Sequence, residues 1–145
     1  MRRVTGPGFA VVAAGGVLGS LARFAIEQSA PLVHGSIWAT FAVNVLGCLA
    51  IGIVIPLLQP ASSSPSSFST RSSSMLHLFL VTGVLGGFTT FSAFAAEVVL
   101  TADGQVQGGS TGLALLYMGA TLLVGLLAVP LGVRVSAVLS GGGAR

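Results

Sequence analysis

The sequence is short of charge. Only 6% of its 145 residues are charged, whereas 53% are hydrophobic. Soluble proteins carry about 25% charged residues, so this composition cannot cover a surface that faces water. The sequence also lacks lysine, and all six basic residues are arginines. The shortage of charged residues excludes an ordinary soluble domain and predicts an integral membrane protein.

Cysteine and catalytic side chains are scarce as well. Cys48 is the single cysteine, so the chain cannot form an internal disulfide, and we interpret this residue as a small buried hydrophobe. His34 and His77 lie near the ends of apolar segments, and Asp103 lies in a glycine-rich loop. No cluster of catalytic residues is visible, so we expect no enzymatic activity. We interpret the arginine excess as an orientation signal and not as a nucleic-acid surface.

Four apolar segments are each long enough to cross a bilayer, which takes roughly 20 helical residues. They run over residues 9–28, 36–58, 75–100 and 112–133. We therefore expect one all-α membrane domain of four helices that covers residues 1–145. Residues 60–74 are rich in serine and cannot bury enough apolar surface to become ordered, so this segment is expected to be a flexible loop.

The arginines predict the topology. With four spans, one side of the membrane carries five of them: Arg2, Arg3, Arg71, Arg134 and Arg145. Cytoplasmic segments carry the excess of arginine and lysine, so both termini are expected in the cytoplasm of a multi-pass protein of the cell membrane. Arg134 is expected to close the fourth span, and Pro130 to bend it locally.

Small residues recur at helical spacing within the spans. They form the pairs Gly15/Gly19, Gly16/Ser20 and Gly83/Gly87, with Gly47 in the second span. Such residues let helix backbones approach closely in membranes. The pattern predicts tight helix association, either within the chain or with a second copy.

The segment Gly86–Phe94, Gly-Gly-Phe-Thr-Thr-Phe-Ser-Ala-Phe, interrupts the third span. Backbone that leaves helical geometry inside a membrane must be buried in protein or line a polar path. In transporters, such interruptions mark ion sites. We therefore expect a break in the third helix and an ion pathway beside it.

Neutral hydrogen-bonding side chains occur in the neighbouring spans. Asn44 can donate two hydrogen bonds without carrying charge, and Thr40 lies one turn earlier on the same helical face. This favours recognition of a small anion, with a helix–helix hydrogen bond as the alternative. Tyr117 and Thr121 share a face of the fourth span, where their hydroxyls line a path or bond to their own helix.

Two charges and two aromatic rings complete the candidate residues. Arg23 either snorkels to the interface or provides a positive charge at the mouth of an anion path. Glu97 would repel an anion, so we interpret it as a structural or gating group. Phe91 and Phe94 are three residues apart and are either packing residues or a pair whose positive ring edges cradle an anion. The residues point to a small anion or polar solute and do not choose the ion.

The sequence resembles the CrcB/Fluc fluoride channels. The resemblance rests on Gly16-Val17-Leu18-Gly19 through Arg23, on Thr40 through Asn44 to Gly47, and on Gly86 to Phe94. It implies a channel that exports fluoride down its electrochemical gradient, built as a dimer of two inverted four-span subunits within membrane lipids.

The resemblance also implies roles for individual residues. Phe91 and Phe94 match an aromatic box and Asn44 a pore asparagine, while Thr40, Ser92 and Tyr117 match a polar track along the pore. The backbone carbonyls of Gly86 and Thr89 would hold a structural Na⁺ on the dimer axis. Three positions depart from the usual pattern: Ala93 lacks a hydroxyl, Thr121 replaces a serine, and Ala39 replaces a glycine.

Three questions stay open at this point. The arginine bias suggests that the chain inserts one way and pairs with a separately encoded inverted homologue, whereas a dual-topology homodimer is the alternative. A proton-coupled multidrug exporter of similar size would need a deep carboxylate, but Glu27 and Glu97 lie near span ends. A non-transporting assembly subunit would explain the glycines but leave the polar residues without a role.

Overall fold

The computed structural model describes residues 6–29, 37–58 and 75–141 of the chain. In this part the elements are helical: α1 (Gly6–Ser29), α2 (Ile37–Leu58), η1 (Leu78–Leu85), α4 (Gly86–Phe88), α5 (Phe91–Ala102) and α6 (Thr111–Leu139). Four stretches are long and apolar enough to span a membrane, one each in α1, α2, Met75–Ala102 and α6. The four-span expectation is therefore confirmed.

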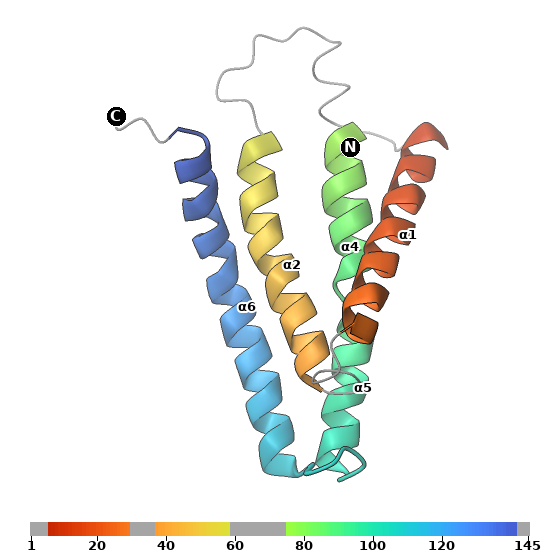
Figure 1. Ribbon diagram of the computed structural model, residues 1–145, viewed down its shortest axis with the longest axis vertical. Coiled ribbons are helices and arrows are strands. Elements are labelled where there is room, and N and C mark those ends of the chain that lie inside the picture. The colour runs from red at the N-terminus through yellow and green to blue at the C-terminus, as the bar shows by residue number, and fades with distance from the viewer. Residues whose placement is uncertain (1–5, 30–36, 59–74, 142–145) are drawn as a thin grey trace, which may run out of the picture.

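The four spans run alternately up and down the bundle (Figure 1). The start of α1 and the end of α6 lie at the same end, and the third span continues from η1 through α4 into α5 at the other end. Span boundaries differ from expectation mainly at α6, which continues past Arg134 to Leu139. A long arginine side chain can reach the interface while its helix stays in the membrane, so it need not end the span. The expected loop 60–74 and the start at Ser36 lie outside the described residues.

The third span is broken, as the sequence predicts. Helical geometry ends at Phe88, and Thr89 and Thr90 are extended, with φ/ψ of −76°/154° and −144°/119°. α5 then begins at Phe91, and the Thr90 side chain caps it by accepting a hydrogen bond from the N–H of Ala93 at 3.2 Å. The sequence did not predict that Leu78–Leu85 forms a π-helix, a geometry that is frequent at functional sites.

Glycines bring α1 against the first half of the third span. A Cβ added to Gly15 would lie 2.9 Å from the Cα of Gly83, and one added to Gly87 would lie 2.9 Å from the Cα of Gly16. Backbone therefore touches backbone here, which confirms the prediction of close helix approach within the chain. This contact fixes the position of the segment that leads into the break.

α2 and α6 pack along each other on the other side of the break. A Cβ on Gly132 would lie 3.0 Å from the Cα of Gly52, and one on Gly125 would lie 3.4 Å from the Sγ of Cys48. Near the opposite end of α6, a cluster of buried Ile37, Phe94 and Tyr117 joins α2, α5 and α6. The break is thus held between α1 on one side and the α2–α6 pair on the other.

Candidate functional site

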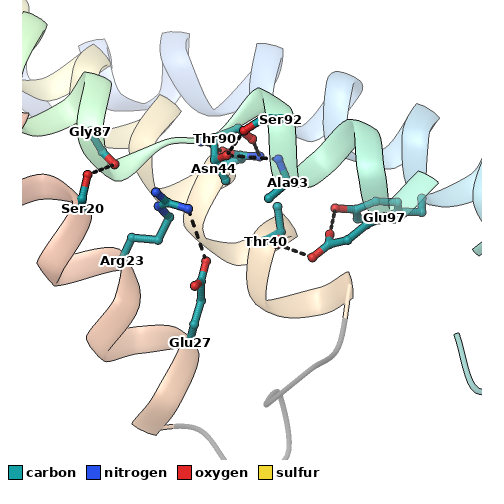
Figure 2. Close-up of polar contacts among 11 residues, drawn as sticks. Ser20, Arg23, Glu27, Thr40, Asn44, Gly87, Thr90, Ser92, Ala93 and Glu97 are labelled. Carbon is teal, nitrogen blue, oxygen red and sulfur yellow. Dashed lines mark hydrogen bonds and ion pairs between the residues drawn. The ribbon is translucent and has the colours of Figure 1, made fainter. Parts of the chain in front are cut away.

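Asn44 of α2 bridges the break. Its Nδ2 donates to the carbonyl of Thr90 at 3.0 Å, and its Oδ1 accepts from the N–H of Thr90 at 2.9 Å. Figure 2 shows the amide facing the extended backbone. Thr90 is only 8% exposed, so water can replace these bonds only poorly. The helix–helix hydrogen bond that the sequence left as an alternative for Asn44 is therefore present, and it clamps the backbone of one residue, Thr90, outside the helix.

This clamp changes the hydrogen bonding of the carbonyls before it. In a continuous helix the N–H of Thr90 would bond to the carbonyl of Gly86, and the N–H of Ala93 to that of Thr89. Here these donors bond to the side chains of Asn44 and Thr90 instead. The carbonyls of Gly86 and Thr89 are thereby separated from their usual helical donors. The carbonyl of Gly87, between them, accepts from the Ser20 hydroxyl at 3.3 Å.

Freed carbonyl oxygens of this kind suit a hard cation. Ions such as Na⁺ and Ca²⁺ are held in proteins by oxygen ligands, backbone carbonyls among them. Gly86 also carries no side chain, and a Cβ placed there would have its nearest neighbour at 4.0 Å, so the space beside it is open. Both residues therefore offer a backbone oxygen donor of the type that a hard cation binds, and the side of Gly86 where a Cβ would stand is open.

The aromatic residues follow the break at the start of α5. The ring centroids of Phe91 and Phe94 lie 5.8 Å apart, and those of Phe94 and Tyr117 lie 5.5 Å apart. Phe94 is buried at 7% exposure, whereas Phe91 is 77% exposed. The expected neighbourhood of the two phenylalanines is present, but only one of them is enclosed within a single chain.

Glu97 joins three helices. It accepts from the Thr40 hydroxyl of α2 at 2.6 Å and from the Tyr117 hydroxyl of α6 at 2.7 Å. Three residues that the sequence analysis singled out thus form one connected cluster. Figure 2 shows Thr40 and Glu97 of this cluster facing each other. The cluster ties α5 to the α2–α6 pair about two turns below the break.

Two other predicted hydroxyls have local partners. The Thr121 hydroxyl donates to the carbonyl of Tyr117 on its own helix at 2.7 Å, which is the alternative the sequence left open for it. The Ser92 hydroxyl lies 3.3 Å from that of Thr90 and is exposed. Ser92 therefore belongs to the break, whereas the donor capacity of Thr121 is already used within α6.

Arg23 extends from α1 toward the break, as Figure 2 shows. Its Nη1 lies 3.9 Å from Oε1 of Glu27, one turn later on the same helix. Its Nε is buried and has no hydrogen-bond acceptor among the described residues. A guanidinium with an unused donor near the end of a span can attract an anion or bind a backbone carbonyl. The sequence identified Arg23 but not its pairing with Glu27.

A pocket of about 440 Å³ lies between α2, the break and α6. Its lining is mostly apolar, with polar groups contributed by a few residues that include Asn44, Thr89, Thr90 and Thr121. Gly86, Phe91 and Phe94 also border it. Most residues that the sequence assigned to the pathway therefore surround one space, while Thr40, Glu97 and Tyr117 lie beyond it toward α5's far end.

The structure also reveals contributors that the sequence analysis did not assign to the site. Ser20 was interpreted only as a small packing residue, yet it bonds to the carbonyl of Gly87. Thr90 caps α5 and receives the Asn44 clamp. A threonine three residues before the Ala93 N–H is a usual capping arrangement, so the pattern Thr-Phe-Ser-Ala could have signalled the new helix start.

Comparisons with known proteins place the chain in a family. The family described as "CrcB-like protein, Camphor Resistance (CrcB)" matches residues 10–133. A relative in Thermus thermophilus, named "Fluoride-specific ion channel FluC", is 39% identical over 138 residues, which covers 92% of this chain and 98% of the relative. "Fluoride-specific ion channel FluC 1" of Streptomyces coelicolor is 42% identical over 132 residues, covering 88% of this chain and 75% of the relative. A protein of Novosphingobium aromaticivorans with the same FluC name is 38% identical, covering 87% and 93%.

Proposed function

The chain belongs to the CrcB family, and from this premise we propose that it is a fluoride channel. It carries fluoride out of the cytoplasm down the electrochemical gradient of the ion and so relieves fluoride toxicity. The observation that carries the proposal is the break in the third span, with its clamp, its freed carbonyls and its two phenylalanines beside one pocket.

The donors around the break suit a small, strongly hydrated anion. Permeation requires a site that is favourable enough to enter and weak enough to leave. The polar groups at the pocket are an amide and hydroxyls, none of which carries a fixed positive charge that would trap the ion. The hydroxyls of Thr89 and Thr121 already donate to carbonyls four residues earlier, so the donor that supports the proposal is the Asn44 amide, which has a second N–H hydrogen beside the one bonded to Thr90. Phe91 and Phe94 add ring edges with partial positive charge. Arg23, near the break, attracts anions toward the entrance.

A Na⁺ ion held by the carbonyls of Gly86 and Thr89 belongs to the proposal. The clamp at Thr90 separates these carbonyls from their helical donors, which supports their use as ligands. When bound, the ion supplies a fixed positive charge that lowers the cost of bringing an anion into a low-dielectric region. The chain's own contribution is to keep both carbonyls outside the helical hydrogen-bond ladder.

A second, inverted subunit completes the site. Phe91 is 77% exposed, so a single chain encloses only one of the two rings. An inverted neighbour placed against the break would cover Phe91 and bring its own broken helix to the same level of the membrane. The antiparallel arrangement lets both breaks meet at mid-membrane, as inverted repeats do in transporters.

The orientation of the chain and the identity of its partner are linked. The start of α1 and the end of α6 lie at one end of the bundle, which is the arrangement expected if both termini are cytoplasmic. Because the arginine bias favours one orientation, we propose that the partner is a separately encoded inverted homologue. Robust fluoride efflux from vesicles that contain this chain as the only subunit would instead establish a dual-topology homodimer.

The function is tested by anion efflux from vesicles loaded with fluoride or with chloride. Both the chain alone and the chain with its inverted homologue are reconstituted, and Phe91→Ile and Leu122→Ile are compared with the parent. The parent should pass fluoride much faster than chloride, and Phe91→Ile should lose this flux because the ring edge is removed. Leu122 borders the same pocket without an aromatic ring, so its variant should behave as the parent does. Equal fluoride and chloride efflux in the parent would exclude a selective channel.

A further inference from the structure

Glu27 carries a charge that the proposed pathway does not use. The chain has only three acidic residues, which are Glu27, Glu97 and Asp103. Glu97 accepts hydrogen bonds from two hydroxyls, and Asp103 is exposed at the end of α5. Glu27 lies within α1, in a segment long and apolar enough to span a membrane. A charge in such a segment is costly, so its position calls for a partner or a function.

One face of α1 carries Glu27 toward the mouth of the proposed path. At successive spacings of four, three and four residues, this face presents Gly16, Ser20, Arg23 and Glu27. A Cβ on Gly87 would lie 2.9 Å from the Cα of Gly16, and the Ser20 hydroxyl donates to the Gly87 carbonyl at 3.3 Å. The face therefore begins against the third span beside the break, and it reaches Glu27 near the end of α1 at Ser29.

Arg23 and Glu27 form an ion pair that leaves donors of the guanidinium unused. The Nη1 of Arg23 and the Oε1 of Glu27 lie 3.9 Å apart, which is longer than an N–H···O hydrogen bond of about 2.7–3.2 Å. The buried Nε of Arg23 has no acceptor within the part of the chain that the structure describes. Glu27 therefore offsets much of the positive charge of Arg23, while the Nε–H stays available to an anion.

The charge of Glu27 is screened only in part. The Arg23 and Glu27 side chains are 26% and 32% exposed, so water reaches both of them and surrounds neither. Figure 2 shows the guanidinium of Arg23 on the side of α1 toward the break, with Glu27 on the next turn. Glu27 also acts electrostatically on Glu97 in α5, so its field is not confined to α1. Removing this negative charge should therefore raise the potential of the whole mouth.

We propose that Glu27 limits how strongly the entrance at Arg23 attracts the permeating anion. The inference rests on the proposed channel function and gives a role to a residue that lies outside the pathway. Arg23 alone combines a full positive charge with several N–H donors, and this combination retains an anion. With Glu27 beside it, the donors remain but the pair has no net charge, so the anion can leave as well as enter.

The test is the fluoride current across planar bilayers that contain the complete channel, with equal fluoride concentrations on both sides. Glu27→Gln keeps the size of the side chain and removes its charge. At low ionic strength, the fluoride concentration that gives half-maximal current should fall roughly tenfold, because the uncompensated Arg23 concentrates anions at the mouth. The difference from the parent should vanish at an ionic strength of about 1 M, set with N-methylglucamine gluconate at constant Na⁺, where charges are screened within roughly 3 Å.

Three further variants separate the charge of Glu27 from its shape and from the net charge of the chain. Glu27→Asp keeps the charge and should keep the half-maximal concentration near that of the parent, whereas Glu27→Ser removes the charge and should match Glu27→Gln. Asp103→Asn changes the net charge by the same amount at an exposed position and should leave the half-maximal concentration unchanged. A partly exposed ion pair contributes little to stability, so all these variants should fold.

A half-maximal concentration that stays at the parent value in Glu27→Gln would overturn the inference, and so would an equal shift in Asp103→Asn. A shift that persists at high ionic strength would overturn it as well, because it would arise from a change of shape and not of charge. Equal fluoride and chloride currents in the parent overturn the proposed function instead, so the two failures are read from different measurements.

Discussion

Replacing Asn44 with leucine tests whether the clamp holds the break open. The substitution keeps a side chain of similar size and removes both hydrogen bonds to Thr90, at 3.0 Å and 2.9 Å. It leaves the N–H and the carbonyl of a residue that is 8% exposed without these partners. An unpaired buried polar group costs about 1–3 kcal/mol, so the two together should lower the free energy of unfolding by roughly 2–6 kcal/mol.

The assay is unfolding by denaturant in detergent, followed by fluoride efflux from vesicles. Thr82→Leu serves as the control because Thr82 is an exposed polar residue in η1, so its replacement should change stability little. Asn44→Leu should unfold at much lower denaturant concentration and lose fluoride efflux. An unchanged unfolding midpoint with lost efflux would refute the clamp and leave Asn44 as an ion ligand only.

Three further predictions test other contacts of the fold and the site. Gly15→Ala should destabilise the protein by about 1–3 kcal/mol, because its Cβ would lie 2.5 Å from the carbonyl oxygen of Phe79. Gly16→Ala is the control and should be tolerated, because a Cβ there meets nothing within 4 Å. Denaturant unfolding curves that coincide for the two variants would contradict this prediction. Tyr117→Phe removes the 2.7 Å hydrogen bond to Glu97 and should lower the free energy of unfolding by about 1–3 kcal/mol in the same denaturant assay. A parent-like unfolding midpoint would argue against a stabilising role of the cluster of Thr40, Glu97 and Tyr117. Replacing Na⁺ by a large organic cation during purification should reduce fluoride efflux, and re-addition of Na⁺ should restore it, whereas undiminished efflux in thoroughly Na⁺-free buffer would count against a cation at the break.

The sequence predicts the spans well because lipid imposes a simple rule. A run of about 20 apolar residues must be helical to satisfy its backbone inside the membrane, so four such runs define four helices. The position of the break also follows from sequence, since Gly86-Gly87 and Thr89-Thr90 stand within an otherwise apolar span. The helix α6 continues past Arg134, where the fourth span was expected to end, to Leu139, because a single arginine does not stop a helix when its side chain can reach the interface.

The partners of the polar residues could not be predicted in the same way. Spacing places Thr40 and Asn44 on one face of α2, but it does not reveal that one bonds to Glu97 and the other to Thr90. These pairs join residues that are 57 and 46 positions apart, so they depend on how the helices pack. The π-helix of Leu78–Leu85 has no sequence signal of its own and arises where glycines press the third span against α1.

The most direct test of the account is a competition measurement in vesicles loaded with fluoride and chloride together. The complete channel, whether formed by this chain alone or with its inverted homologue, should release the fluoride while the chloride stays inside. Release of both anions at the same rate would contradict the claim that the broken third span forms a fluoride-selective path.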